Sequence, residues 1–301
     1  MQRRFDMKPI QSPIFLLLLT GLFLGLTFPF GKMASVAGIS PIVWAWLISA
    51  GSGVCLLGLH AMSKRLPCLQ SHFVIYYFCA SVVSLVFPNI LIFTVIPKLG
   101  AGFTGLLFTL SPVFTLAISS LWNVRVPNML GIAGITLSFL GAGIVGWTKG
   151  DITQPASFIW VVVGLCIPLS LAIGNVYRTL AWPAGARPLE LAVGSNLSAG
   201  IILTLIIFIH PGIELPGGLL TIKEIAILAV VASTAMFTVF FRLQEVGGPT
   251  YLSQIGYVAA AVALFSGTVF LSEKYSMVTW IGAAIIVTGV LTSIRAQQRS
   301  T

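Results

Sequence analysis

Six polar side chains interrupt long uncharged stretches of this sequence, and they are the residues best suited to bind a small molecule. An amide or a hydroxyl inside hydrocarbon must find a hydrogen-bonding partner, so such residues face the interior of a helix bundle. Amides and hydroxyls both donate and accept hydrogen bonds, and tyrosine adds an aromatic surface. We therefore expect the following residues to contact a substrate: Asn89, Ser111, Asn175, Tyr177, Gln254 and Tyr257.

The residues that could catalyse a reaction or hold a metal ion are scattered instead. All seven acidic residues fall near the ends of apolar stretches or in loops, and the three histidines flank such stretches. The four cysteines show no paired spacing. A nucleophile with its base, or a set of metal ligands, needs these groups close together. We expect no catalytic residue, no metal site and no cofactor.

The composition places the chain in a membrane. Of its 301 residues, 57% are hydrophobic and 8% are charged, and the mean hydropathy is +1.03. Soluble domains carry about 25% charged residues, and a bilayer core needs roughly 20 apolar residues per helix. The sequence predicts an all-α integral membrane protein with ten transmembrane helices, at about residues 13–37, 41–59, 72–96, 100–121, 128–147, 157–180, 188–209, 220–242, 248–271 and 277–295.

Basic residues divide unevenly between the two sides of this arrangement. With the N-terminus inside, 11 of the 16 Lys and Arg residues lie inside, including every arginine. Positive residues favour the cytoplasmic side, so both termini are expected in the cytoplasm. The net charge of +9 follows from this topology and needs no nucleic-acid partner.

Prolines lie within several of the predicted helices. Pro88, Pro112 and Pro168 are expected to kink their helices, and Pro29 lies in the first one. A proline frees backbone carbonyls, which are tolerated at membrane depth where they face protein or a water-filled cavity. The alternative is that proline is simply common in membrane helices.

The two halves of the chain resemble each other. The segment "KLGAGFTGLL" (98–107) matches "VGGPTYLSQI" (246–255), and "NMLGIAGITLSFLGAGI" (128–144) matches "TWIGAAIIVTGVLTSIR" (279–295). Each pair is separated by about half the chain. Five helices per half would make the second half enter the membrane from the opposite face, as in many secondary transporters. We predict two inverted-topology five-helix repeats, residues 1–150 and 151–301.

Three segments carry a resemblance to a known family: "LLFTLSPVFTLAISSLW", "FFRLQEVG" and "FSGTVFLSEKYSMVTWIGAAIIVTGV". The chain resembles the EamA-type branch of the drug/metabolite transporter superfamily. Ser111 and Pro112 match the family's pattern in the fourth helix. Glu273, Trp280 and Gly282 match its pattern at the end of the ninth helix and the start of the tenth.

The resemblance implies ten helices, cytoplasmic termini and a central cavity lined by helices 1, 3, 4, 6, 8 and 9. It also implies outward transport of small metabolites. The chain departs from the family pattern in two places, at "WNVRVPN" (122–128) and at Ala259–Ala260. The two halves have therefore diverged, and their mechanism need not be symmetric.

The absence of acidic residues from the predicted helix centres suggests a cavity without charge. Such a cavity suits a neutral or zwitterionic solute, including amino-acid-like metabolites, bound between Ser111 on one wall and Gln254 with Tyr257 opposite. Arg178 and Glu190 could form a cytoplasmic gate. We favour an arginine that reaches water and a solvated glutamate, and expect both to be dispensable for substrate recognition.

The leading hypothesis is a secondary transporter in a bacterial inner membrane that exports small metabolites by alternating access. A passive channel or another non-transport membrane protein is the alternative, and an intramembrane enzyme is the least favoured. The expected partners are a small-molecule substrate and the lipid bilayer, with a homodimer left open and no nucleic acid.

Overall fold

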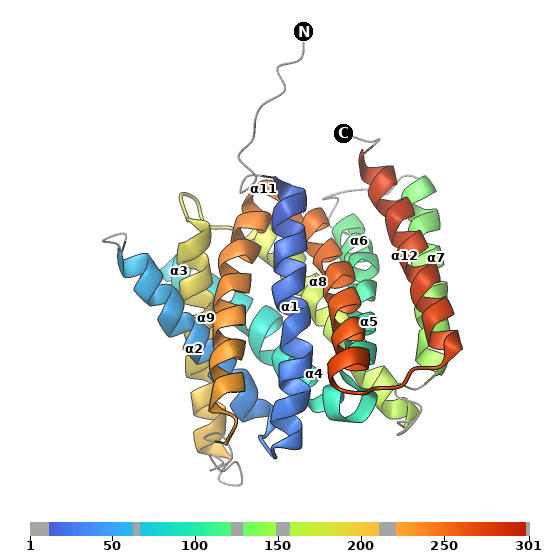
Figure 1. Ribbon diagram of the computed structural model, residues 1–301. Helices are drawn as coiled ribbons and strands as arrows, with labels where there is room; N and C mark the ends of the chain where they lie inside the picture. Colours follow the sequence, from blue (N-terminus) through green and yellow to red (C-terminus); the bar gives the residue numbers. More distant parts are fainter. Residues whose placement is uncertain (1–11, 63–66, 122–128, 149–156, 211–220, 299–301) are drawn as a thin grey trace.

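The structure, a computed structural model, describes residues 12–62, 67–121, 129–148, 157–210 and 221–298. In these residues the regular structure is helical throughout (Figure 1). Several of the charges used to predict the orientation, including Arg3, Arg65, Arg125 and Lys149, lie outside them. The elements are α1 Pro13–Val36, α2 Pro41–Met62, α3 Ser71–Ser81, η2 Val82–Val86, α4 Phe87–Leu99, α5 Ala101–Leu107, η3 Phe108–Leu110, α6 Ser111–Leu121, α7 Met129–Trp147, α8 Phe158–Leu180, α9 Pro188–Ile209, α11 Lys223–Phe270 and α12 Met277–Gln298.

Eight helical segments of the described chain are long and apolar enough to cross a membrane. Two of them are composite, because α3, η2 and α4 follow one another over 71–99, and α5, η3 and α6 do so over 101–121. The apolar stretches of α7 and α12 are shorter, at Met129–Val145 and Met277–Gly289. The length and apolar composition of these helices suit a membrane-spanning chain, while ten crossings and the inverted arrangement of the halves stay predictions.

α11 differs from the sequence-based expectation of two helices at 220–242 and 248–271. The structure forms one helix of 48 residues, which bends at the end of the bundle where α1 begins and then runs back (Figure 1). The bend falls between the two apolar segments Lys223–Gly247 and Tyr251–Phe270, at the sequence Gly-Gly-Pro. Proline bends a helix because it lacks an N–H group and its ring displaces a carbonyl in the preceding turn. We call Lys223–Gly247 the first arm of α11 and Tyr251–Phe270 its second arm.

Glycines bring α1 against the second arm of α11. A Cβ added to Gly21 would lie 2.4 Å from the Cβ of Val258, and one added to Gly25 would lie 2.5 Å from the Cβ of Val262. Small residues four positions apart let membrane helices approach closely. The first helix of the first half therefore packs on the second half of the chain, which joins the two halves in one bundle.

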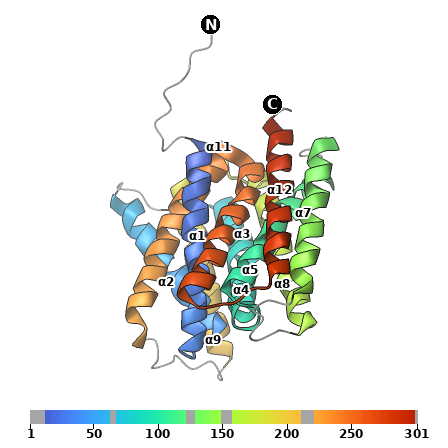
Figure 2. The same cartoon turned by 45° about the vertical axis from the view of Figure 1, so that its right-hand side comes forward.

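α7 and α12 form a pair at one edge of the bundle, side by side in both views (Figures 1 and 2). Their backbones meet at glycines, since a Cβ on Gly141 would lie 2.9 Å from the carbonyl oxygen of Gly282. Ser138 donates a hydrogen bond to the Ile286 carbonyl at 3.4 Å, and Thr279 donates one to Thr148 at 2.9 Å. Hydroxyl groups and close backbone contact thus hold together two helices that present little polar surface.

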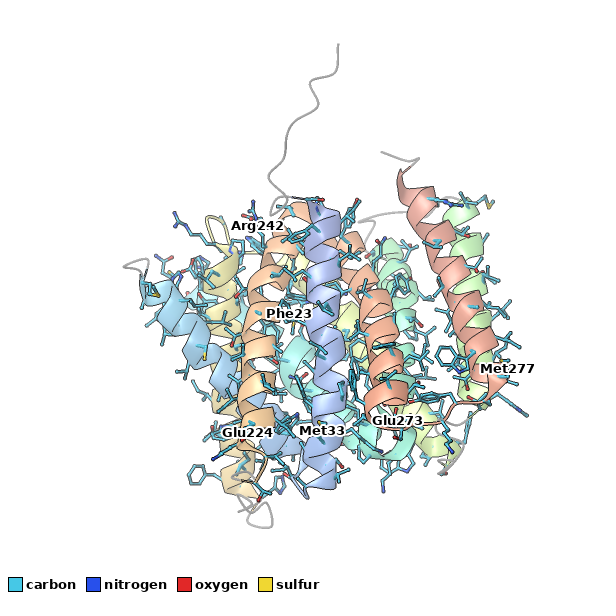
Figure 3. All side chains as sticks on the ribbon, in the orientation of Figure 1. Phe23, Met33, Glu224, Arg242, Glu273 and Met277 are labelled. Carbon is cyan, nitrogen blue, oxygen red and sulfur yellow. The ribbon has the colours of Figure 1, made fainter. Side chains whose placement is uncertain are left out.

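Glu273 links the loop after α11 to the start of α5. Its side chain is 3% exposed, and its carboxylate accepts hydrogen bonds from the backbone N–H groups of Ala101 at 2.7 Å and Gly102 at 3.1 Å. The hydroxyl of Tyr275 donates a third bond to the same carboxylate. The first N–H groups of a helix have no partner within the helix, so this carboxylate satisfies them. Glu273 lies at the end of the bundle opposite Arg242 (Figure 3).

Candidate functional site

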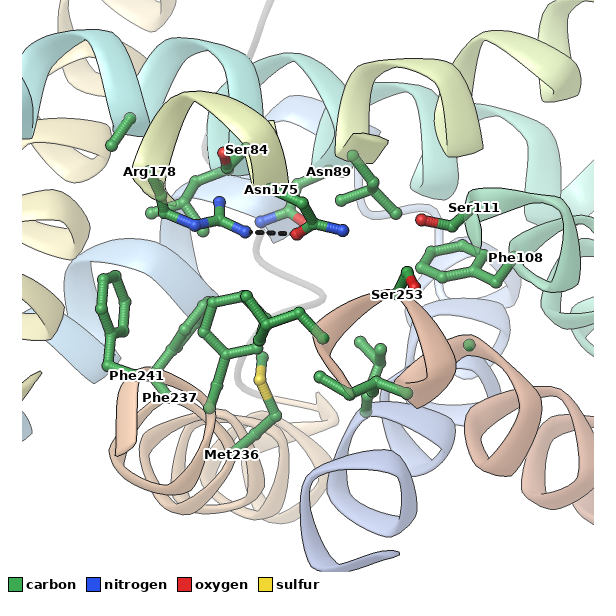
Figure 4. Close-up of a pocket in the computed structure, with 18 of the residues that line it drawn as sticks. Ser84, Asn89, Phe108, Ser111, Asn175, Arg178, Met236, Phe237, Phe241 and Ser253 are labelled. Atoms are coloured by element: carbon green, nitrogen blue, oxygen red, sulfur yellow. Dashed lines mark hydrogen bonds between the residues drawn. The ribbon is translucent and has the colours of Figure 1, made fainter. Parts of the chain in front are cut away.

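A cavity lies among α1, α3, η2, α4, η3, α6, α8, α9 and both arms of α11 (Figure 4). The centre of a water molecule can move through about 80 Å³ of this cavity. One water needs only ~10–15 Å³ on the same measure. It extends from the middle of the helices, at Leu24 and Ser111, toward the end of the bundle where α8 ends and the second arm of α11 begins, at Arg178 and Leu252. The space is large enough for a small solute.

A π-helical turn shapes the wall that the third span contributes. The N–H of Phe87 donates five residues back to the Val82 carbonyl, which defines η2. In the same pattern the Val83 carbonyl would pair with residue 88, but Pro88 has no N–H. The hydroxyl of Ser170 on α8 donates to that carbonyl instead, at 2.7 Å. The irregular turn places Ser84 and Leu85 on the cavity.

The fourth span also changes its winding beside the cavity. The 3₁₀ turn Phe108–Leu110 directly precedes Ser111 and Pro112. The Phe108 carbonyl lies so close to the second arm of α11 that a Cβ on Gly256 would sit 2.5 Å from its oxygen. Phe108 and Ser111 both line the cavity. Pro168, the third predicted kink, lies inside α8, which is one uninterrupted α-helix from Phe158 to Leu180.

Polar side chains gather on one wall of the cavity, which we call the polar wall. Figure 4 shows Ser84, Asn89, Ser111, Asn175 and Arg178 along it. Three of the six predicted contact residues therefore lie together here, namely Asn89, Ser111 and Asn175. They come from three spans, two of them consecutive in the sequence and the third from the other half of the chain.

Arg178 is the largest departure from the sequence-based reading. It was expected to reach water from the end of its helix, but it is 2% exposed and lines the cavity. Its Nη2 donates to the Asn175 side-chain oxygen at 2.7 Å, and its Nε donates to the Gln244 side-chain oxygen at 3.1 Å. The guanidinium also lies 4.8 Å from the ring centre of Phe240, a cation–π distance. The expectation of a charge-free cavity is wrong, because an arginine stays protonated in proteins.

An apolar wall, formed by Met236, Phe237, Phe240 and Phe241 on the first arm of α11, faces the polar wall (Figure 4). Phe240 packs edge-to-face on Phe241 with ring centres 5.4 Å apart. Such rings contribute large rigid surfaces. Sequence reasoning missed this wall, because an apolar residue in an apolar helix carries no signal of its own.

Three predicted contact residues lie away from the lining. Tyr177 stacks on Tyr76 of α3 with ring centres 6.0 Å apart. Gln254 is buried and Tyr257 partly buried on the second arm of α11, where their neighbours Ser253 and Gly256 line the cavity instead. A wall made by Gln254 and Tyr257 therefore stays a prediction, and the structure offers Ser253 in its place.

The suggested gate between Arg178 and Glu190 is not formed in the structure. Glu190 accepts hydrogen bonds from the backbone N–H groups of Cys68 at 2.8 Å and Arg187 at 3.4 Å. It thereby caps the start of α9, while Arg178 binds two amide groups. Within the described ranges, no three His, Cys, Asp or Glu residues are grouped as metal ligands would be.

Helices of membrane-spanning length around an internal cavity are typical of an integral membrane protein. Residues 11–147 and 158–295 each match the EamA-like transporter family. The chain therefore belongs to the EamA-like transporter family, with two copies of its domain.

The relatives agree with this class. The chain is 25% identical over 202 residues to the protein named "Uncharacterized inner membrane transporter YedA" of Escherichia coli strain K12, and equally to its counterpart in Escherichia coli O157:H7. The alignment covers 64% of this chain and 61% of each relative, so the chain spans about three fifths of these relatives. A solved crystal structure shares the fold, with a TM-score of 0.61 and 13% identity over 91% of this chain and 96% of that one.

Proposed function

We propose that this transporter is a secondary carrier that moves small metabolites by alternating access to the cavity. The observation that carries the proposal is the origin of the lining residues. Ser84, Asn89 and Ser111 come from the first family repeat, and Asn175 and Arg178 come from the second. Two repeats that share one site can expose it to either side by rocking against each other. The halves 1–150 and 151–301 would be the moving units.

The expected solutes are small metabolites of neutral or zwitterionic character, amino-acid-like compounds among them. The polar wall offers hydrogen bonds and the apolar wall offers aromatic surface, which suits a compound with a polar head and an apolar body. A zwitterion fits better than an uncharged solute, because Arg178 places a positive charge in the cavity. The proposal assigns the protein no catalytic step.

The membrane, the orientation and the direction of transport belong to the same proposal. The name of the Escherichia coli relatives supports an inner-membrane location. The excess of basic residues on one side supports cytoplasmic termini. The ends of α1 and α12 nearest the termini lie at the same end of the bundle (Figure 2). Outward transport follows from the family resemblance alone. A homodimer would carry two such cavities, since the lining described here comes from one chain.

Counterflow in proteoliposomes tests this function. Vesicles containing the purified full chain are loaded with one unlabelled metabolite from a panel, diluted, and given a trace of the same metabolite in labelled form. A carrier accumulates the label transiently, and only when the matching metabolite is inside. Label entry at the same rate into empty vesicles would indicate the passive channel, and protein-free liposomes give the background.

A further inference from the structure

The charge balance of the cavity points to the chemistry of the solute. Arg178 is buried, and no carboxylate within the described chain contacts it. Glu190 is used in the cap of α9, Glu245 pairs with Arg242 at the surface, and Glu273 holds the start of α5. A buried charge without a counter-charge is costly, and an ionisable residue inside a membrane protein marks a functional site.

The neighbours of Arg178 increase the surplus of hydrogen-bond donors. A guanidinium only donates, so the side-chain oxygens of Asn175 and Gln244 must face it. The amide nitrogen of Gln244 is then left buried without an acceptor among the described residues. The hydroxyls of Ser84 and Ser195 line the cavity and are likewise unpaired within the described part of the chain. Within the described part of the chain, only two of the five N–H donors of Arg178 have side-chain acceptors.

Two of these donors, on Ser84 and Arg178, lie close together. A Cβ added to Gly174 would lie 2.1 Å from the Ser84 hydroxyl oxygen and 3.3 Å from Nη1 of Arg178. Both groups are therefore within reach of one small acceptor. Figure 4 shows the guanidinium at one end of the polar wall, with the apolar wall facing it.

We propose, on the basis of the proposed transport function, that the substrate is a small organic carboxylate, amino-acid-like zwitterions included, whose carboxylate group binds Arg178. A carboxylate supplies the missing negative charge and accepts two parallel hydrogen bonds from a guanidinium. The apolar body of the substrate packs against Met236, Phe237 and Phe241. A phosphate monoester is the less suitable anion, since its charge of nearly −2 exceeds the single positive charge of this largely apolar cavity.

Matched pairs of probes test the assignment. The pairs are 4-methylpentanoate with 4-methylpentanamide and 3-phenylpropanoate with 3-phenylpropanamide, and phenyl phosphate is added as a third anion. Binding to the purified full chain is measured by ligand-dependent thermal stabilisation. We expect each carboxylate to bind about ten- to hundredfold more tightly than its amide, the range for a hydrogen bond to a charged group.

Two variants separate recognition from structural support. Arg178→Gln should remove the preference for carboxylate over amide. Asn175→Asp should remove it as well while keeping the fold, because it places a built-in carboxylate next to Nη2, where the Asn175 oxygen now lies at 2.7 Å. Arg242→Gln is the matched control, since Arg242 is partly exposed and pairs with Glu245. It should bind every probe as the unaltered chain does.

The inference is overturned if the carboxylates stabilise the unaltered chain no better than the amides, or if phenyl phosphate binds more tightly than 3-phenylpropanoate. It is also overturned if Asn175→Asp keeps the preference for carboxylates, which would make Arg178 a structural link between α8 and α11. This binding assay needs no transport. Carboxylate binding without counterflow would therefore refute the proposed carrier but support binding of a carboxylate by Arg178. Counterflow of amides as readily as carboxylates would support the carrier but refute binding of a carboxylate by Arg178.

Discussion

Replacing Glu273 with glutamine should destabilise the bundle far more than its position in a loop suggests. The carboxylate accepts hydrogen bonds from the N–H groups of Ala101 and Gly102 and from the hydroxyl of Tyr275. Glutamine has nearly the same shape, but it keeps one acceptor oxygen and turns a donor toward groups that also donate. At about 1.5–3 kcal/mol for a hydrogen bond to a charged group, the expected loss is about 3 kcal/mol.

Thermal unfolding of the purified protein measures this loss. For a chain of this length, each kcal/mol of lost stability lowers the unfolding temperature by about 2 °C. The unfolding temperature of Glu273→Gln should therefore fall by roughly 6 °C. Glu224→Gln is the control, since Glu224 is an exposed glutamate near the same end of the bundle (Figure 3). It should unfold with the unaltered chain. Equal unfolding temperatures for Glu273→Gln and Glu224→Gln would refute the reasoning that the carboxylate holds the start of α5.

Three further predictions concern close contacts. Gly25→Ala should destabilise the protein by about 1–3 kcal/mol through overpacking. Adding Val262→Gly should recover part of this in the same unfolding assay, because it removes the Val262 Cβ that the new methyl group meets; an unchanged unfolding temperature for Gly25→Ala would contradict the packing. Gly174→Ala should weaken binding of 4-methylpentanoate, since its methyl group would displace the Ser84 hydroxyl. Adding Ser84→Ala should remove this clash but not replace the lost hydroxyl, so the double variant should bind as tightly as Ser84→Ala alone. Weaker binding by the double variant than by Ser84→Ala would contradict this. Burial, together with the neighbouring Glu273 carboxylate, raises the pKa of Tyr275. The stability of the folded protein should therefore fall above about pH 10, where the tyrosine of the unfolded chain ionises. Tyr275→Phe should lose less stability in this pH range, and equal losses in both proteins would contradict this interpretation.

The positions of the spans could be predicted because membrane thickness fixes their length. Stretches of roughly 20 apolar residues located the helices to within a few residues at most boundaries. The continuity of α11 could not be predicted in the same way. Its Gly-Gly-Pro sequence is typical of a turn, whereas the structure continues the helix through it.

The polar wall was partly predictable, because an amide or hydroxyl within a membrane must face the bundle. That rule identified Asn89, Ser111 and Asn175, which line the cavity. It did not identify Arg178, whose place two residues before the end of α8 suggested that it reaches water. Its spacing from Asn175 was the available signal, since residues three apart share a helix face.

Access to residue 111 from both sides of the membrane tests the carrier most directly. Ser111→Cys is made on a background in which the four native cysteines, all free in the structure, are replaced. Right-side-out and inside-out vesicles are treated with a membrane-impermeant thiol reagent, with and without 3-phenylpropanoate. Alternating access predicts labelling from either side, slowed by the carboxylate in both preparations. Labelling from one side only, or from neither, would contradict a central cavity that opens alternately to the two faces.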